Sequence, residues 1–267
     1  MNQKTMLITG ATDGIGKATA QALAMQGHTV ILHGRNAARG QAAVDELKKA
    51  AGHDRVDFMA ADLSSLREVR QLAAAVQAKY EQLHVLINNA GVFMNERQLT
   101  EDGFEMTFAV NHLAPFLLTQ QLLLLLRQSA PARIITVSSV AHQRGRINFD
   151  DLQSERAFNG YRAYAHSKLA NVLFTYELAA RLAGAGVTAN CLHPGVIGTK
   201  LLQTGFGIGG ATPAEGARTS VYLASAPEVE TVTGAYFDDL RAVPSAPQTH
   251  DETTRRRLWE ISEQLCQ

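Results

Sequence analysis

The feature of this sequence that most restricts its fold is the regular alternation of short apolar runs with longer helical patterns. Six apolar runs, each five or six residues long, stand between segments of helical periodicity. Five of the six are mostly apolar rather than alternating, which is typical of strands covered on both faces. Strands that alternate with helices in this way predict repeated β-α-β units, a parallel sheet and a doubly wound α/β fold.

The expected elements follow from these patterns. Strands are predicted at residues 5–9, 29–33, 56–60, 84–88, 133–138 and 187–192, with a candidate edge strand at 234–239. Helices are predicted at about 15–26, 37–51, 65–80, 103–127, 160–183, 213–225 and 250–265. No Pro/Ser-rich linker and no internal repeat divides the chain, so we expect one domain spanning residues 1–267.

Composition argues against several classes of function. The formal net charge of the 267 residues is zero, which gives no electrostatic pull toward nucleic acid. Cys191 and Cys266 are far apart in sequence, which fits a reducing cytoplasm better than a disulfide framework. The N-terminus leads directly into the first strand, and the apolar stretch 116–128 is short and interrupted by Gln. We therefore expect a cytoplasmic protein without a signal peptide or a membrane span.

A glycine-rich turn follows the first predicted strand. The stretch "TGATDGIG" (9–16) places Gly10, Gly14 and Gly16 between that strand and a helix. Glycines let the backbone approach a phosphate closely, and the N-terminus of the helix offers free N–H groups. The spacing is not the common G-x-G-x-x-G, and tight turns also favour glycine. The position of the turn nevertheless predicts a dinucleotide site.

The end of the second strand indicates which dinucleotide is bound. Folds that prefer NAD usually carry an acidic residue there for the ribose 2′-hydroxyl, whereas this chain has Gly34 and then Arg35. A guanidinium suits a 2′-phosphate by charge and by its planar set of donors. Asp13 in the glycine loop would oppose a phosphate if its side chain turned inward. We expect NADP(H), with NAD(H) as the less favoured cofactor and a surface arginine as the alternative interpretation of Arg35.

Six motifs in order carry a resemblance to a known family. They are "TGATDGIG", "NNAG" (88–91), "VNHLAPF" with Asn111, "VSSVAH" with Ser139, "YAHSK" with Tyr164 and Lys168, and "HPGVIGT" (193–199). Over nearly its whole length the chain resembles the short-chain dehydrogenase/reductases. The stretches "SSVAHQRGRINFDDLQ" and "YAHSKLANVLFTYELAARL" are most similar to the retinol dehydrogenase and WW-domain oxidoreductase branch.

The resemblance implies both a topology and a chemistry. It implies a Rossmann-like sheet of seven parallel strands in the order 3-2-1-4-5-6-7, with helices on both faces. It also implies hydride transfer between a nicotinamide and a carbonyl or alcohol. By the same resemblance Ser139 binds the substrate oxygen, and Lys168 holds the nicotinamide ribose. The side chain of Asn111 or the helix backbone there anchors a water that relays protons to Lys168. An amide that fills a helix kink is the alternative for Asn111.

Tyr164 is the candidate general acid and base. Residues four apart on a helix share one face, so Lys168 lies beside Tyr164, whereas Tyr161 is two turns from the lysine. A free phenol has a pKa of about 10, and a neighbouring ammonium lowers it. We expect Lys168 to lower the pKa of Tyr164 and Tyr161 to be a pocket wall or a surface residue. Ser138 and Ser139 point to opposite sides of a strand, so only one of them can face the cleft.

Cofactor contacts are expected along the whole carboxyl edge of the sheet. Asp62 ends the third strand near the adenine, and "NNAG" would pass close to the adenosine ribose. By resemblance the backbone at Val196 and Ile197 binds the nicotinamide carboxamide, and Thr199 reaches a phosphate or that carboxamide. The cofactor-binding candidates are Gly10, Thr12, Asp13, Gly14, Ile15, Gly16, Arg35, Asn36, Asp62, Leu63, Asn89, Ala90, Gly91, Tyr164, Lys168, Pro194, Gly195, Val196, Ile197 and Thr199.

Residues 198–213 are expected to cover the substrate. Five glycines in and beside "GFGIGG" indicate a mobile segment, and four large apolar side chains indicate an apolar substrate. A flexible surface loop is the alternative interpretation of the same residues.

Together these observations predict an NADP(H)-dependent oxidoreductase for a small apolar carbonyl or alcohol. A cofactor-binding regulator without turnover and a C=C reductase are the competing hypotheses. The long apolar helices 103–127 and 160–183 carry more hydrophobic surface than one sheet face needs. We therefore expect a homodimer or homotetramer, and we expect no metal, no membrane and no nucleic acid as partners.

Overall fold

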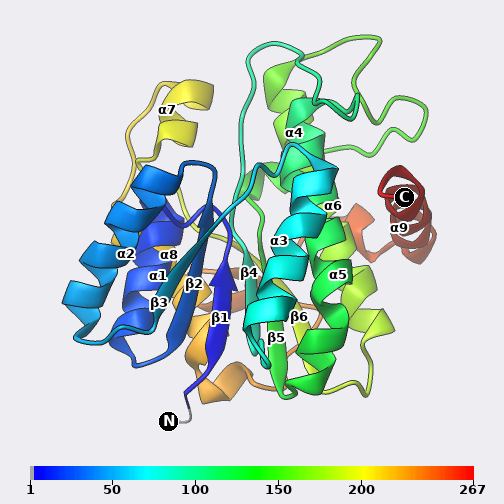
Figure 1. Cartoon of the computed structure of the whole chain (residues 1–267). Coiled ribbons are helices and arrows are strands. Elements are labelled where there is room, and N and C mark those ends of the chain that lie inside the picture. Colours follow the sequence, from blue (N-terminus) through cyan, green and yellow to red (C-terminus); the bar gives the residue numbers. More distant parts are fainter. Residues whose placement is uncertain (1–2) are drawn as a thin grey trace.

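The computed structural model describes residues 3–267, which form an eight-stranded sheet with helices on both faces (Figure 1). The strand order is β3-β2-β1-β4-β5-β6-β7-β8, and every neighbouring pair is parallel except β7 with β8. The strands are β1 (Thr5–Ile8), β2 (Thr29–Gly34), β3 (Val56–Ala60), β4 (Val85–Asn88), β5 (Ala132–Val137), β6 (Val187–His193), β7 (Tyr236–Asp238) and β8 (Arg241–Val243).

The α-helices account for most of the remaining chain. They are α1 (Gly14–Met25), α2 (Ala37–Ala51), α3 (Leu66–Lys79), α4 (Met106–Phe108), α5 (Ala114–Gln128), α6 (Gly160–Arg181), α7 (Lys200–Phe206), α8 (Pro213–Ser225) and α9 (Glu252–Leu265). Two short irregular helices matter for the site. They are the π-helix η1 (Ala109–Leu113) and the 3-10 helix η2 (Val140–Arg144).

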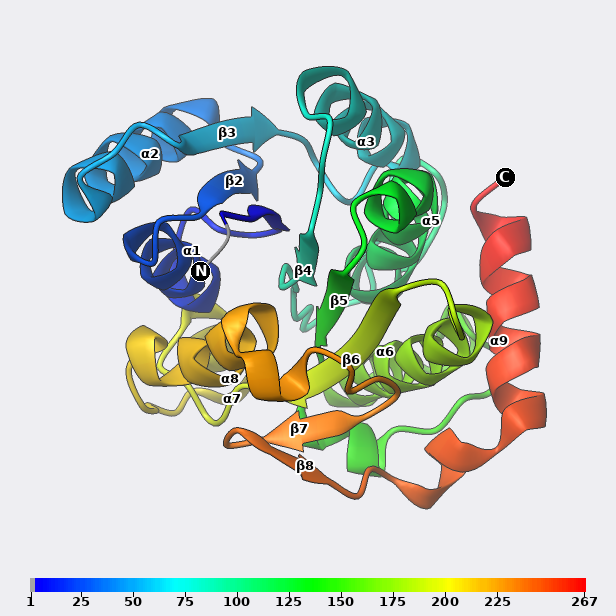
Figure 2. The ribbon, with the colours of Figure 1, turned by 90° about the horizontal axis from the view of Figure 1, so that it is seen from below.

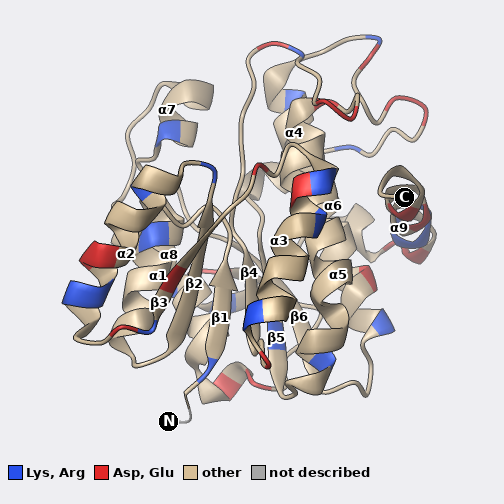
Figure 3. Cartoon of the chain, viewed as in Figure 1, with Lys and Arg blue, Asp and Glu red and all other residues tan. Residues whose placement is uncertain are grey.

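Helices lie on both sides of the sheet (Figure 2), and a separate hydrophobic core fills each side. Successive residues of a strand point to opposite faces. Leu7 of β1 accordingly packs with α3, α5 and α6, whereas Met6 and Ile8 pack with α1, α2 and α8. Charged residues of both signs lie mainly on the outer helices and loops, as the coloured ribbon of Figure 3 shows. The central strands β1, β2, β4, β5 and β6 are buried on both faces, which explains why their sequences do not alternate.

The prediction of seven strands was one short. The chain reverses after β7 through Asp239 and Leu240, which have φ angles of 41° and 66°. Two left-handed residues make the kind of tight turn that joins antiparallel strands, so β8 returns along β7 as the edge of the sheet. The three residues of β8 are too few for a pattern, and the turn lacks the Asn-Gly or Asp-Gly pair that would have indicated it.

The helix predicted at 103–127 is broken. It starts at Met106, after Glu105, whose carboxylate accepts hydrogen bonds from the N–H groups of Thr107 and Phe108. It then passes through the wide turn of η1 before α5 begins. Pro115 has no N–H, so the carbonyl of Asn111 lacks the donor that an α-helix would supply four residues on. The wide turn accommodates this missing bond.

One stretch is long and apolar enough to cross a membrane by length and composition, contrary to the sequence argument from 116–128 alone. It runs from Met106 to Gln128, and 78% of its most apolar window is buried inside the fold. Burial of this kind is what a core helix requires, so the stretch is weak support for a membrane span.

The C-terminal helix covers the surface on which the expected subunit pairing was based. Helix α6 is buried on all sides from Ala163 to Ala179. Helix α9 packs along it through Leu258 and Trp259, with the indole ring stacked on Phe174 at a centroid distance of 5.9 Å (Figure 2). The surplus apolar surface of α6 is therefore covered by the same chain. The homodimer or homotetramer stays a prediction, but the reason given for it is wrong for α6.

Candidate active site

A cleft of about 1330 Å³ runs across the carboxyl ends of the parallel strands. Ligands of open α/β sheets bind at this edge, where the strand order reverses between β1 and β4. All the predicted site residues line the cleft except Asn36 and Asn111. The volume exceeds the 300–1,000 Å³ or so of a usual small-molecule pocket, so it suits a dinucleotide together with a second molecule.

The glycine loop is packed as closely as its sequence suggests. Gly10 and Gly14 have positive φ angles of 64° and 54°, which favour glycine. A Cβ on Gly16 would lie 2.3 Å from the carbonyl oxygen of Gly10 and 2.4 Å from the amide nitrogen of Asn89. Asp13 is the N-cap of α1, and its carboxylate accepts a hydrogen bond from the N–H of Gly14.

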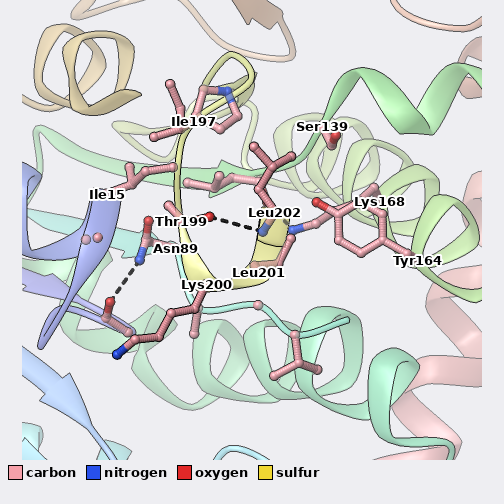
Figure 4. Close-up of a pocket in the computed structure, with 18 of the residues that line it drawn as sticks. Ile15, Asn89, Ser139, Tyr164, Lys168, Ile197, Thr199, Lys200, Leu201 and Leu202 are labelled. Carbon is pink, nitrogen blue, oxygen red and sulfur yellow. Dashed lines mark hydrogen bonds between the residues drawn. The ribbon is translucent and has the colours of Figure 1, made fainter. Parts of the chain in front are cut away.

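Buried polar side chains tie this loop to the end of β4. The hydroxyl oxygen of Thr9 accepts hydrogen bonds from the N–H groups of Asn89 and Ala90, at 2.9 and 3.0 Å. The Asn89 amide donates back to the carbonyls of Thr9 and Gly10 (Figure 4). The residues expected to approach the pyrophosphate and the ribose are thus fixed relative to one another. In this way Asn89 holds the loop.

Asp13 does not face the cofactor side as an unpaired negative charge. Its carboxylate lies 2.7 Å from the ammonium of Lys200 and 3.0 Å from the guanidinium of Arg39. The hydrogen bond with Lys200 is the largest of the effects that lower the pKa of Asp13. Arg39 and Lys200 both line the cleft, and the sequence analysis missed them. The spacing of four residues between Arg35 and Arg39 was the one feature of the sequence that could have indicated a role for Arg39 in the same site.

Arg35 lies at the mouth of the cleft, beyond the end of β2. Its side chain is 72% exposed and forms a loose ion pair with Asp62, at 3.9 Å. Both residues are therefore placed where the sequence argument expected the adenosine end of a dinucleotide. Asn36 is not, because its side chain caps α2 by accepting a hydrogen bond from the N–H of Arg39.

Three of the four predicted catalytic residues meet on the other side of the cleft (Figure 4). Ser139 is the N-cap of η2, two residues after the end of β5, and its hydroxyl accepts a hydrogen bond from the N–H of Ala141. Ser138 is turned away, with its hydroxyl donating to the carbonyl of Lys168 at 2.7 Å. Tyr164 is buried, whereas Tyr161 packs edge-on against Phe206 in the wall of the cleft.

The expected lowering of the Tyr164 pKa by Lys168 is wrong. Burial raises the pKa of Tyr164 to about 12, and the hydroxyl of Ser139 opposes this only in part. Burial also lowers the pKa of Lys168, to about 8. The ammonium nitrogen lies 5.6 Å from the centre of the Tyr164 ring. Desolvation is therefore the largest influence on the pKa of both groups.

Lys168 has hydrogen-bonding capacity to spare. Its ammonium carries three donors, and among residues 3–267 the acceptor it reaches is the carbonyl of Val137, at 2.9 Å. Gly91 leaves room beside it, since a Cβ there would lie 3.4 Å from the ammonium nitrogen. A buried ammonium with free donors beside an open backbone fits the hydroxyl groups of a ribose.

Asn111 lies behind the cleft rather than in its wall. Its amide oxygen accepts from the N–H of Val92 at 2.7 Å, and its amide nitrogen donates to the carbonyl of Val92 and to the hydroxyl of Ser167. The side chain is therefore fully used in joining the segment after β4 to α6. The resemblance offers the side chain or the helix backbone at Asn111 for holding a water. The side chain is fully bonded, whereas the main-chain carbonyl lacks its α-helical partner because of Pro115.

The segment after β6 forms the last wall of the cleft. Ile197 is buried, and the N–H of Gly198 bonds the carbonyl of Ala211, which closes the base of the segment that follows. Much of the predicted covering loop is helical, because residues 200–206 form α7. Thr199 caps this helix by accepting a hydrogen bond from the N–H of Leu202 (Figure 4). None of the residues of α7 is buried.

Aromatic side chains connect α7 to the catalytic tyrosine. The ring of Phe93 lies 5.6 Å from that of Tyr164 and 5.4 Å from that of Phe206, between ring centres. Phe206 in turn lies 6.1 Å from Tyr164. The sequence analysis gave no role to Phe93, which comes two residues after the "NNAG" motif. The rings of Phe93 and Phe206 thus pack against the ring of Tyr164.

Comparisons with known proteins agree with this geometry. Residues 4–206 match the family model of the short-chain dehydrogenases. Retinol dehydrogenase 14 of Homo sapiens is 45% identical, over 98% of this chain and 86% of that protein. A crystal structure of an uncharacterized protein from Mycobacterium paratuberculosis superposes with a TM-score of 0.83 at 36% identity, covering 99% of this chain and 93% of that one.

A third comparison shows a cofactor. A short-chain dehydrogenase from Escherichia coli CFT073, solved in complex with NADPH, superposes with a TM-score of 0.76 at 27% identity. The match covers 90% of this chain and 98% of that one. The chain belongs to the short-chain dehydrogenase/reductase family, in its retinol dehydrogenase-like branch. It is accordingly an oxidoreductase of a family that uses nicotinamide cofactors.

Proposed function

We propose that this protein is an NADP(H)-dependent oxidoreductase that interconverts a carbonyl and an alcohol on an apolar small molecule. The observation that carries the proposal is the convergence of Ser139, Tyr164 and Lys168 at one wall of the cleft. A hydroxyl pair and a buried ammonium are what proton transfer to a carbonyl oxygen requires.

In carbonyl reduction the nicotinamide supplies the hydride when it is bound. Ser139 donates a hydrogen bond to the substrate oxygen, and the Tyr164 hydroxyl gives that oxygen its proton. Lys168 holds the ribose hydroxyls with its free donors, and its charge favours the phenolate left on Tyr164. The main-chain carbonyl of Asn111 holds the water through which the lost proton is replaced. The oxidation of an alcohol runs through the same groups in reverse.

The preference for NADP(H) is supported by the charges at the adenosine end of the cleft. Arg35, Arg39 and Lys200 line it, with two carboxylates, Asp13 and Asp62, as their partners. A 2′-phosphate would compete with those carboxylates for the guanidinium groups. Gly34 leaves no acidic residue where the 2′-hydroxyl of NAD would be bound.

An apolar substrate is supported by the exposed side chains of the cleft. Exposed large apolar residues are few in the described part of the chain, and Val140, Val196, Phe206 and Ile208 all line this cleft. Exposed apolar patches of this kind mark binding surfaces. We propose that residues 198–213, with α7, close over the substrate through Phe206. The similarity to retinol dehydrogenase 14 makes retinal one compound to test among others.

The test is an incubation of the protein with NADPH and a panel of aldehydes and ketones of increasing apolar length. We expect NADPH oxidation that grows with apolar length and is faster than with NADH. Binding of NADPH without any turnover across the panel would instead indicate a cofactor-binding regulator.

A further inference from the structure

His33 is a buried histidine at the carboxyl end of β2, and the proposed reaction does not use it. It lines the cleft but is only 2% exposed. Its ring lies between two segments on the adenosine side of the site. Nδ1 is 3.3 Å from the backbone nitrogen of Gly10 in the glycine loop, and Nε2 is 3.1 Å from the carbonyl oxygen of Ala61, next to Asp62.

These two partners fix the tautomer of the ring. The backbone N–H of Gly10 can only donate, so Nδ1 must accept and carries no proton. The carbonyl of Ala61 can only accept, so Nε2 must carry the proton and donate it. The neutral Nε2–H form is the one form that satisfies both partners. An imidazolium would set two donors against each other at Gly10.

The surroundings of His33 keep the ring neutral. Burial lowers its pKa to about 4, while the hydrogen bond to Ala61 and the charge of Asp62 oppose this in part. Asp62 is the charged group that acts on the ring, and it is itself paired with Arg35. At neutral pH both hydrogen bonds of the His33 ring, to Gly10 and to Ala61, are therefore present.

The backbone of His33 adds a second bond to the glycine loop. Its carbonyl accepts a hydrogen bond from the N–H of Ala11, at 2.8 Å. One residue thus binds the successive N–H groups of Gly10 and Ala11. The N–H groups that follow, at the start of α1, are the ones left for phosphate oxygens.

We propose that His33 is a positioning residue for the dinucleotide, because its imidazole sets the spacing between the glycine loop and the segment 61–63 that flank the adenosine and pyrophosphate. The proposal rests on the proposed use of NADP(H). It assigns no contact between His33 and the reacting atoms.

Two other histidines provide matched controls. Nδ1 of His28 accepts from the N–H of Lys4 at 3.3 Å, and Nδ1 of His84 accepts from the N–H of Thr5 at 3.0 Å. His28 directly precedes β2 and His84 directly precedes β4, so both lie at the opposite end of the sheet from the cleft. They make the same kind of bond without touching the site.

The experiment is calorimetric titration of NADP⁺ into the wild type and into His33→Ala, His33→Asn and His33→Gln. The amide oxygen of Asn can take the place of Nδ1 and restore the bond to Gly10, whereas Gln can restore only the bond to Ala61. We expect Kd to rise about tenfold for His33→Ala and about threefold for both His33→Asn and His33→Gln, because each amide keeps one of the two bonds that the imidazole makes. The KM for the cofactor should follow Kd, with kcat unchanged at saturation. His28→Ala should lower the melting temperature without changing Kd.

The ¹⁵N signals of the His33 ring add a test on the wild type that needs no stable variant. We expect a protonated Nε2 and a bare Nδ1 at neutral pH. A protonated Nδ1, unchanged binding by His33→Ala, or wild-type binding by either His33→Asn or His33→Gln would overturn the proposal. Failure of the wild type to bind NADP⁺ would overturn the proposed function instead, so the two failures are distinct.

Discussion

The two halves of the cleft are held together by different forces. On the cofactor side, buried His33 and the amide of Asn89 hydrogen-bond the backbone of the glycine loop, and the hydroxyl of Thr9 accepts hydrogen bonds from the N–H groups of Asn89 and Ala90. On the substrate side, α7 has no buried residue and reaches the site mainly through the ring of Phe206. Directional bonds fix a geometry, whereas apolar contacts tolerate sliding. The comparison indicates that the cofactor site is preformed and that the substrate site adapts.

The largest effect should come from the group between the two halves. Tyr164→Phe keeps the ring contacts with Phe93 but removes the hydroxyl that transfers the proton. General acid catalysis contributes about 10²–10⁴-fold, so kcat should fall by that factor. Calorimetry should show NADPH binding as in the wild type. The matched control is Tyr161→Phe. A greater loss of turnover in that variant would show that the proton transfer belongs to Tyr161 and not to Tyr164.

On the cofactor side, Arg35→Ala should weaken NADPH and leave NADH nearly unchanged. Because Arg35 is exposed and paired with Asp62, we expect about a tenfold loss in kcat/KM, at the low end of a charge-assisted bond. Asp62→Asn should shift the preference the other way by freeing the guanidinium. Arg67→Ala removes another exposed, paired arginine and is the control. Equal losses with NADH and NADPH on Arg35→Ala would make Arg35 a turn residue only.

The structure also rules out one obvious way to reverse that preference. Introducing an acidic residue at Gly34 would place a Cβ 2.7 Å from a methyl carbon of Thr12 in the glycine loop. A contact that short forces the loop to move, so a weaker cofactor affinity would follow from sterics alone. Variants at Arg35 and Asp62 therefore separate the charge effect from packing.

On the substrate side, Phe206→Ala should raise KM for long apolar carbonyls by about fivefold, since a half-buried ring contributes roughly 1 kcal/mol. Short aldehydes and both cofactors should be unaffected. Met25→Ala removes an exposed apolar side chain of α1 and serves as the control. An equal change for short and long substrates would mean that α7 does not contact the apolar part of the substrate.

A smaller effect should appear in the pH profile, where Lys168 connects both halves. Burial lowers the pKa of Lys168 from 10.5 to about 8, so its charge is present below about pH 8 and lost above it. The rate of carbonyl reduction should accordingly fall as the pH rises through 8. The free energy of unfolding should change in the opposite direction and rise with pH. Burying the charged form of Lys168 costs free energy below pH 8, and this cost disappears between pH 8 and 10.5. A rate that stays constant from about pH 7 to 10 would contradict the role of Lys168.

The sequence predicted the cofactor side better than the substrate side, for a physical reason. Strand ends and glycines determine where a backbone passes, so the spacing of Gly10, Gly14 and Gly16 was enough to place the loop. Side chains that act from a distance in sequence left no pattern. His33 and Phe93 meet the site only after the chain has folded, and nothing local marks them.

Two errors have the same origin. Helix α9, which is distant in the sequence, covers α6. The periodicity of α6 shows that its surface is apolar, but it does not show whether the same chain or a second subunit covers that surface. The pKa of Tyr164 depends on how deeply both it and Lys168 are buried, which spacing along a helix does not tell. Local spacing in the sequence thus predicted where these residues lie along the chain. It did not predict how deeply they are buried or what covers them.

The most direct test of the account is to follow one hydride. The protein is incubated with NADPH that carries deuterium at both C4 positions and with a long conjugated enal, which offers both a carbonyl and a C=C bond. The product is analysed by mass spectrometry and NMR. The account predicts an allylic alcohol with deuterium on the former carbonyl carbon. A saturated aldehyde with deuterium on the chain, or NADPH bound with no deuterium transferred to this or any other carbonyl, would contradict it.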